Sequence, residues 1–312
     1  MIIRQAKQED IDSIVVLLQA SLGESLLKKS AEIWNFKHVA NPFGESTVLL
    51  AEENNELIGV RAFMTWRWQI GNQIWNAYRA VDTATHPNHQ GKGIFKKLTL
   101  QALDEVQLKG DCFVFNTPND QSRPGYLKMG WQEVGKIKVA LVPTFFYSLK
   151  FLFSREISES ILSLVQLENL CSIHNKKFSS KNVLFTPKSA QYLKWRYEEN
   201  PLQSYFVYST SDCYVAMYVK KHRFFNELRV VEVIGNHDVI IDKVIQKAII
   251  SYAIKNKCYL VTVADSSLFA FRMYGNFGPK LTFKSLTNNT IFVDQALKIE
   301  NWNYSLGDLE LF

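Results

Sequence analysis

The most constraining feature of this 312-residue sequence is a change of hydrophobic period near residue 91. Residues 57–70 and 74–85 are predicted as two long strands, joined by a Gly71-Asn72 turn. Beyond residue 93 the period changes, because Ile94, Leu98, Ala102 and Val106 recur every fourth residue. This spacing lines one face of a helix with apolar side chains. The chain is therefore predicted to be α/β, with an antiparallel meander that runs through a glycine-containing loop into a helix.

Shorter elements flank this segment and are predicted from the same hydrophobic periodicities. Strands are predicted at 2–3, 47–52 and 112–115, and helices at 11–18 and 122–129. The second of these helices ends at Gly130, a residue type that commonly terminates helices. The first half of the chain thus alternates strands and helices around one sheet.

The composition excludes several classes of protein. Apolar residues make up 47% and charged residues 21%, so the chain can bury a core and is not predicted to be disordered. Lysine and arginine exceed aspartate and glutamate by six, which predicts an ordinary solvated surface, and no basic cluster with interleaved aromatics suggests nucleic-acid binding. No apolar stretch is long enough for a membrane span. The start MIIRQAKQED lacks a signal sequence and the four cysteines are widely spaced, so we expect a cytoplasmic protein with buried thiols.

The second half of the chain repeats features of the first in the same order. A Trp-x-aromatic precedes an Asn-Pro at 34–42 and again at 195–201, and a tyrosine stands four residues before a glycine at 126–130 and at 274–278. Residues 241–252 form a second amphipathic pattern where the first half has its glycine-led helix. This order predicts a duplication, with domains at 1–145 and 146–312.

The loop before the helix is a candidate anion site. Gly91 and Gly93 allow close backbone approach, the free amides of a helix N-terminus favour phosphate, and Lys92 adds positive charge. The segment is not a Walker loop, since no Lys-Ser/Thr follows at the required spacing. Nor is it a dinucleotide-binding fingerprint, because an antiparallel meander precedes it.

These motifs resemble those of the GCN5-related N-acetyltransferases (GNAT). Gln90 to Gly93 matches Gln/Arg-x-x-Gly of the family's motif A, although Phe95 replaces the usual small residue and leaves less room beside the pyrophosphate. The run from Tyr126 to Trp131 matches Tyr-x-x-x-Gly-aromatic of motif B, and His86-Pro87 and Pro118-Asn119 also fit. The resemblance covers residues 1–140. It implies a GNAT fold, a mixed and mostly antiparallel sheet flanked by helices with splayed central strands, followed by a second GNAT-like domain.

The resemblance also implies acetyl-CoA as co-substrate, with the pantetheine arm in the gap between the splayed strands. The residues expected to bind it are Ala84, Thr85, His86, Gln90, Gly91, Lys92, Gly93, Ile94, Phe95, Asn119 and Tyr126. We expect no metal, because His86 and His89 have no third ligand with them and are more typical of a loop or cap.

The second half lacks any counterpart of the glycine loop and has acidic Asp238 where phosphate would sit. We therefore interpret it as a degenerate copy that shapes the acceptor site and binds no cofactor. Together with Trp195-Arg196-Tyr197 and the closing residues 302–312, it resembles two-domain acetyltransferase-like proteins of surface-polysaccharide biosynthesis. That likeness implies a primary-amine acceptor such as an amino sugar, attacked directly in a ternary complex.

Three groups are candidates for the proton transfers. Tyr126 is the general acid that the family match implies, or else a structural core tyrosine. Asp82 is the candidate base, or else a strand residue in an ion pair, for example with Arg79. The carboxylate of Phe312 is a further candidate, suggested by likeness to the enhanced-intracellular-survival acetyltransferases, against a frayed terminus.

Two other functions stay open from the sequence. One is a tandem-domain acyl or aminoacyl transferase acting on peptide or cell-wall amines, and the other is a non-catalytic CoA-binding module. An aromatic-rich linker either packs between the domains or touches a membrane peripherally; it comprises Phe145, Phe146, Tyr147, Phe151 and Phe153. No motif sets the oligomeric state.

Overall fold

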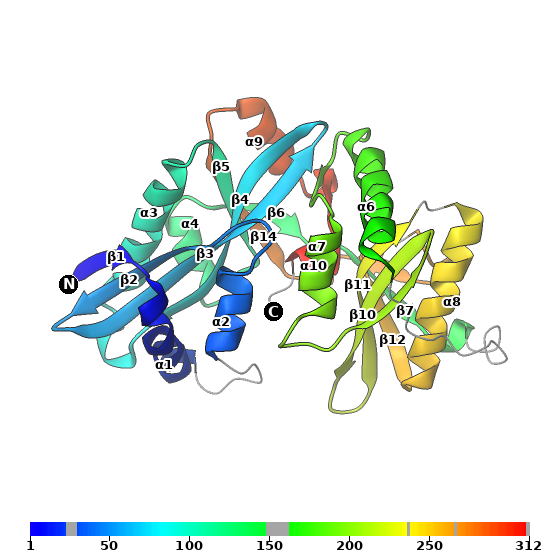
Figure 1. The fold of residues 1–312 in the computed structure, drawn as a ribbon, viewed down its shortest axis with the longest axis horizontal. Coiled ribbons are helices and arrows are strands. Elements are labelled where there is room, and N and C mark those ends of the chain that lie inside the picture. The colour runs from blue at the N-terminus through cyan, green and yellow to red at the C-terminus, as the bar shows by residue number, and fades with distance from the viewer. Residues whose placement is uncertain (23–29, 148–161, 236–237, 265–266, 310–312) are drawn as a thin grey trace.

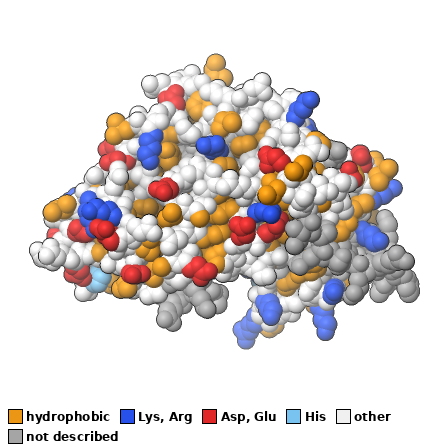
Figure 2. Space-filling model, in the orientation of Figure 1, with side chains coloured by type: hydrophobic (Ala, Val, Ile, Leu, Met, Phe, Trp, Pro, Cys, Tyr) orange, Lys and Arg blue, Asp and Glu red, His pale blue; other side chains and the backbone are white. Residues whose placement is uncertain are grey.

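The computed structural model describes residues 1–22, 30–147, 162–235, 238–264 and 267–309. The chain forms two β-sheets that lie side by side, each with helices packed against it (Figure 1). Among the described helices, none combines the length and the apolar character that crossing a membrane requires. On the face in Figure 2, acidic and basic side chains are intermixed, as expected of a solvated surface.

The first sheet is built mainly from the N-terminal half. Its strand order is β1-β2-β3-β4-β5-β14-β6, and the short strands β8 and β15 extend from β3. The bounds are β1 (Ile2–Gln5), β2 (Thr47–Glu53), β3 (Glu56–Ile70), β4 (Gln73–Thr85), β5 (Cys112–Asn116), β6 (Gln132–Lys136), β8 (Leu184–Phe185), β14 (Lys280–Leu286) and β15 (Trp302–Asn303). All five strands predicted in this half are confirmed, within two residues at their ends.

Helices cover both faces of the first sheet, which explains why its strands are apolar on successive residues. Val48 and Leu50 of β2 pack on the side of α1 (Ile11–Leu22) and α2 (Ala31–His38). Leu49 and Ala51 pack on the other side, against α3 (Ile94–Gln107) and α4 (Arg123–Lys128). The apolar stripe predicted along α3 is buried, although the helix begins at residue 94 rather than near residue 91.

The second sheet has the order β13-β7-β12-β11-β10-β9. Its strands are β7 (Val139–Pro143), β9 (Phe206–Thr210), β10 (Cys213–Lys221), β11 (Asn226–Gly235), β12 (Cys258–Val263) and β13 (Met273–Gly275). One face packs on α8 (Val239–Lys255) and the other on α6 (Leu164–Ser179), α7 (Ala190–Leu193) and the helical turn η3 (Lys194–Glu198). The remaining described elements are η1 (Gln8–Asp10), η2 (Pro87–His89), α9 (Thr290–Ala296), η4 (Ile299–Asn301) and α10 (Leu306–Leu309).

The two sheets exchange a strand. Strand β7, which follows β6 after only two residues, pairs with β12 and β13 in the second sheet. Strand β14, from the C-terminal part of the chain, lies between β5 and β6 in the first sheet. Pairings across about 150 residues leave no local sequence signal. The domain division at residue 145 stays a prediction, and the two sheets do not follow it strand by strand.

The internal repeat is visible in the structure. The order β10-β11-α8-β12 in the second half matches β3-β4-α3-β5 in the first, with the last strand parallel to the second in both. Asn41 and Asn200 each accept a hydrogen bond from the amide two residues later. The repeated aromatic motifs also meet, because Phe36 and Trp195 stack with ring centroids 5.1 Å apart. Tyr274 departs from the repeat, since it lies on the edge strand β13 rather than on a helix as Tyr126 does.

Candidate active site

The central strands of the first sheet separate part-way along their length. Parallel pairing between β4 and β5 covers only four residue pairs and ends at Arg79 and Phe115. Strand β4 then continues to Thr85, still paired with β3. The segment 80–85 therefore borders a gap on the side where β5 would continue. The splayed strands that the resemblance implied are confirmed.

A β-bulge marks the point of separation. Arg61 pairs with Thr83 and Ala62 with Val81, so Asp82 is the extra residue on β4. Its φ of 39° lies in the left-handed region, which aspartate tolerates better than most residues. Such bulges increase the local twist and re-aim side chains, often beside active sites. Here the bulge turns Asp82 toward α2.

Asp82 belongs to a buried cluster with the last two residues of α2. Its Oδ2 forms an ion pair with Lys37 and lies 3.0 Å from His38 Nε2. The other ring nitrogen of His38 lies 2.8 Å from Ser46 Oγ. The ion pair with Arg79 considered from the sequence is not formed. Arg79 instead donates to the backbone carbonyls of Asp308 and Leu309.

The loop between η2 and α3 exposes its backbone amides. Gly91 and Gly93 both have φ of 76°, a conformation that residues with a Cβ rarely adopt. A Cβ at either position would meet no atom within 4 Å, so open space lies beside them. Among the described residues, no atom accepts a hydrogen bond from the amides of residues 91–93, and no side chain caps α3. These are the properties of an anion site at a helix N-terminus.

Tyr126 of α4 is buried beside Arg61 of β3. Arg61 Nη1 donates to the Tyr126 hydroxyl oxygen over 2.9 Å and also to Thr83 Oγ1. Because that oxygen accepts a hydrogen bond from a permanent cation, the Tyr126 proton stays available for donation. The Tyr126 ring is held edge-on by Phe95 and Trp131, at centroid distances of 5.6 and 5.2 Å.

Arg61 itself is unusual. Its side chain is fully buried, and no described residue accepts a hydrogen bond from its Nε or Nη2 atoms. Three aromatic rings surround the guanidinium at 4.8–5.6 Å, those of Phe63, Phe95 and Tyr126. Aromatic faces offset only part of the cost of burying a charge. Unsatisfied buried donors of this kind call for a functional explanation.

The remaining residues expected to bind the donor lie at the end of β4, in the glycine loop and at the starts of α3 and α4. The amide of His86 is already bonded to Ile58 of β3. Successive residues of a strand direct their amides to opposite edges, so the Thr85 amide points toward the gap and the Ala84 amide toward β3. Gln90 and Lys92 are exposed, Ile94 is buried and Phe95 is half-buried at the start of α3. Asn119 caps the turn before α4, where its Oδ1 accepts from the amide and hydroxyl of Ser122.

His86 and His89 take part in surface contacts. His86 lies 3.7 Å from Glu56, and His89 lies 3.4 Å from Glu53 and from Lys92 Nζ. Within the described ranges, no group of three His, Cys, Asp or Glu residues is placed to hold a metal ion.

The four cysteines are buried and unpaired, and burial raises the pKa of Cys112 and Cys171 to about 12. A thiolate nucleophile is therefore disfavoured at these two positions at neutral pH.

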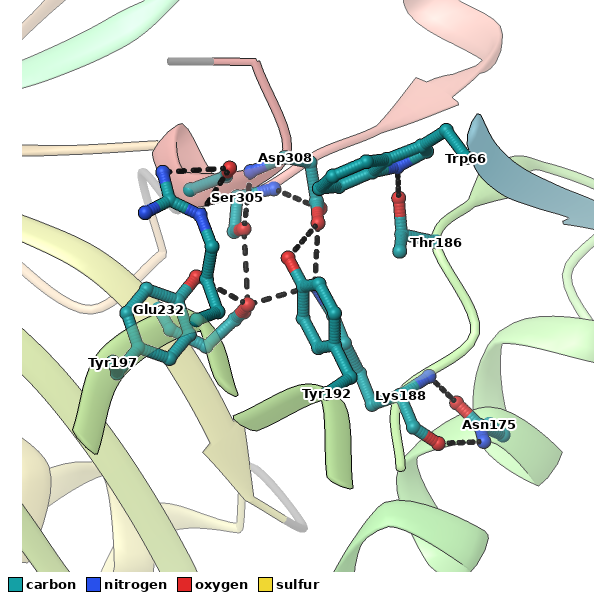
Figure 3. A network of polar contacts seen from close by, with 11 residues as sticks. Trp66, Asn175, Thr186, Lys188, Tyr192, Tyr197, Glu232, Ser305 and Asp308 are labelled. Carbon is teal, nitrogen blue, oxygen red and sulfur yellow. Dashed lines mark hydrogen bonds and ion pairs between the residues drawn. The ribbon is translucent and has the colours of Figure 1, made fainter. Parts of the chain in front are cut away.

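A second buried polar cluster joins β11, α10 and the segment before α7 (Figure 3). Lys188 Nζ lies 2.7 Å from Glu232 Oε2 and 2.7 Å from Asp308 Oδ1, and all three side chains are almost fully buried. Burial disfavours the charged ammonium, but the two carboxylates outweigh it and raise the pKa of Lys188. Burial raises the pKa of Glu232, although Lys188 opposes this. The cluster fixes α10, whose carbonyls hold Arg79 beside the gap.

Sequence reasoning missed the residues that surround Tyr126 and Asp82. Lys37 and His38 directly follow the Trp34-x-Phe36 motif, which was interpreted only as part of the internal repeat. Arg61 does have a sequence signal, because it is the one charged residue in an otherwise apolar stretch of a predicted strand, IGVRAFM. A charge inside a strand that is buried on both faces needs a partner or a function. The Phe312 carboxylate, Phe151 and Phe153 lie outside the described residues.

Comparison with known proteins places this geometry in a family. The family model "Acetyltransferase (GNAT) domain" matches residues 2–134, the region that contains the gap, the loop and Tyr126. Residues 2–134 thus form a GNAT acetyltransferase domain. This domain supports an acyltransferase activity, and the predicted fold class is confirmed. No curated protein sequence matches the chain.

Solved structures share the fold over nearly the whole chain. A GCN5-related N-acetyltransferase from Anabaena variabilis superposes with a TM-score of 0.65 at 14% identity, covering 92% of this chain and 73% of the other. A probable N-acyltransferase from Enterococcus faecalis gives 0.66 at 10% identity, covering 91% and 72%. Eis1 from Mycobacterium abscessus gives 0.60 at 12% identity, covering 96% and 76%. Both sheets of this GNAT protein thus recur in these structures.

Proposed function

We propose that this GNAT enzyme transfers the acetyl group of acetyl-CoA to a primary amine, most specifically to an amino sugar of surface-polysaccharide biosynthesis. The family supplies the reaction type, and the amino-sugar acceptor follows from the resemblance to two-domain proteins of that process. The single observation that carries the donor assignment is the set of open amides at residues 91–93, next to the gap between β4 and β5.

In this proposal the donor lies along β4. Its pyrophosphate binds the amides of Gly91, Lys92 and Gly93 and the positive end of the α3 dipole. The pantetheine arm enters the gap and pairs with the free edge of β4, as an added strand would. The thioester then lies in the gap, with Tyr126 and Arg61 on the α3 side of the sheet and Asp82 on the α2 side.

The reaction needs two proton transfers. The amine attacks the thioester carbonyl only after losing its proton, and at pH 7 a lysine-like amine is almost entirely protonated. The cluster of Asp82 and His38 is the proposed acceptor of that proton. When the tetrahedral intermediate collapses, the carbon–sulfur bond breaks and the thiolate takes a proton from Tyr126. The Nε and Nη2 atoms of Arg61 donate to no described residue, so Arg61 can stabilise the negative charge of the tetrahedral intermediate and of the leaving thiolate.

The direct test is a release assay. The full chain is incubated with acetyl-CoA and a panel of amino sugars, peptides and simple amines, and free CoA thiol is measured. We expect turnover on amino sugars. Turnover on peptide amines alone would favour the alternative acyl transferase, and acetyl-CoA binding without turnover on any amine would indicate a binding module.

Tyr126→Phe is expected to lower kcat by roughly 10- to 100-fold, because a thiolate is a fair leaving group and needs only partial help from an acid. Acetyl-CoA affinity should change little, since the ring packing with Phe95 and Trp131 is retained. Steady-state kinetics and calorimetry measure the two quantities. Tyr78→Phe is the matched control, because Tyr78 is buried in the same core. Equal rates for both variants would leave Tyr126 as a packing residue.

Asp82→Asn is expected to lower kcat/KM at pH 7 by roughly 10- to 100-fold, with recovery as the pH rises toward about 10. The recovery follows because the acceptor amine then loses its proton without help. Asparagine adopts the positive φ of this position readily, so the bulge should be kept. The measurement is a pH–rate profile beside the wild type. A deficit that does not depend on pH would point to a structural role for Asp82.

A further inference from the structure

We propose that the second half of the chain holds its own ligand site, which binds a small organic anion in a cavity between the two sheets. The cavity has a volume of about 750 Å³ and is lined by β11, the end of β12, α6 and the segment after β15. It is separate from the donor loop, since none of residues 80–95 lines it. This inference does not depend on the proposed acetyl transfer.

The cavity lies at the second sheet's counterpart of the gap between β4 and β5. Strands β11 and β12 pair in parallel only as far as Val230 and Val263. A bulge at Val231 then interrupts the pairing of β11 with β10, just as the bulge at Asp82 follows the last β4–β5 pair. Residues 230–233 and 263–264 form walls of the cavity. The duplicated fold has thus produced a second opening between parallel strands, although it lacks the glycine loop.

The floor of the cavity carries one lysine and two carboxylates. Lys188 is shared between Glu232 and Asp308, and Glu232 Oε2 also accepts from Tyr197 and Ser305 (Figure 3). The buried Arg196 guanidinium donates to the carbonyl of Gly307 in α10 and to the hydroxyl of Tyr205. A ligand therefore meets a floor of hydrogen-bonding groups in which one ammonium is shared between two carboxylates.

The mouth is basic. Lys138, Lys177 and Lys181 line it, and Glu300 is the only carboxylate among the described lining residues outside the floor cluster. These lysines come from separate segments, the β6–β7 connection, α6 and the turn after α6, which converge on one opening. Converging cations with low-dielectric walls raise the local concentration of anions.

The residues that form the walls favour an organic molecule over a simple inorganic ion. Phe178, Phe185 and Trp302 contribute aromatic surface to the lining. Lys177 and Lys181 lie 5.7 and 5.2 Å from the centre of the Phe178 ring, so charge and apolar surface are adjacent. Cavities of this size that combine apolar walls with a few polar groups bind small molecules. The fitting ligand has a phosphate or carboxylate head at the lysines and an aromatic or apolar body inside.

The test uses phenyl phosphate and benzoate as the two anionic probes and benzyl alcohol as the neutral one, each followed by saturation-transfer NMR with the full chain. We expect the preferred anion to bind with a dissociation constant on the order of 1 mM or below, and benzyl alcohol at least about tenfold more weakly. The probe that binds more tightly identifies the head group. Saturating acetyl-CoA should not displace it.

Charge-reversal variants locate the site. The double variant K138E/K181E should weaken binding of the preferred anion at least about tenfold. K136E/K176E is the matched control, because these lysines are exposed, lie two and five residues before Lys138 and Lys181, and do not line the cavity. Equal weakening by both pairs, displacement by acetyl-CoA, or no binding of either anion at about 10 mM would each overturn the proposal. Loss of acetyl-CoA binding alone would count against the donor site only.

Discussion

Gly93→Val is expected to weaken acetyl-CoA binding by about 100- to 10,000-fold. Valine is strained at the φ of 76° that Gly93 adopts, and its side chain would enter the open space beside the amides. Losing two charge-assisted hydrogen bonds to the pyrophosphate, each worth about 1.5–3 kcal/mol, corresponds to this range. Isothermal titration calorimetry with acetyl-CoA measures the change directly.

Gly71→Val provides the matched control for Gly93→Val. Gly71 also has a positive φ, of 55°, and open space around it, so the substitution imposes similar strain. It lies in the β3–β4 turn, roughly 35 Å along the hairpin from the donor loop. We expect wild-type affinity in this variant. If the two valine variants bound acetyl-CoA equally well, the loop at residues 91–93 would not be the donor site.

Lys188→Met is expected to lower the free energy of unfolding by about 3–5 kcal/mol. The substitution leaves Glu232 and Asp308 buried without their shared cation, and such uncompensated charges are strongly destabilising. Because burial already raises the pKa of Glu232 in the wild type, the deficit should shrink as the pH falls and the carboxylates take up protons. Urea unfolding at pH 8 and at pH 5 measures both effects.

Two further variants show whether charge is the cause. Lys176→Met removes an exposed lysine of α6 and should change stability by less than about 0.5 kcal/mol. The triple variant Lys188→Met, Glu232→Gln, Asp308→Asn removes all three charges and should recover part of the lost stability. A triple variant less stable than Lys188→Met would show that the hydrogen bonds of the cluster, rather than its charge balance, hold α10 in place.

Local sequence signals were sufficient for the parts of the site that depend on neighbouring residues. The glycine loop and the helix after it were predicted because a glycine pair and a four-residue apolar repeat are properties of nearby residues. The helix that carries Tyr126 was predicted for the same reason, since it ends at Gly130, which has φ of 87°. The β3–β4 hairpin was also predicted from nearby residues, because Gly71-Asn72 is a typical hairpin turn.

Contacts between distant segments could not be predicted in this way. Asp82 was predicted as a base, but its partner Lys37 lies 45 residues away on α2. The partnership of Arg61 with Tyr126 spans 65 residues. The insertion of β14 beside β5, and the Lys188 cluster, join segments more than 100 residues apart. Each of these contacts depends on how the two sheets pack.

By itself, the sequence determined the α/β class, the glycine loop before α3, the GNAT-type motifs and the repeated order of elements, because these features depend on the spacing of nearby residues. Only the tertiary structure decided which charges face each other, how the strands are exchanged between the sheets, and where the second cavity opens. The physical reason is that a side chain's electrostatic partners are set by burial and strand register, which arise when remote segments pack together.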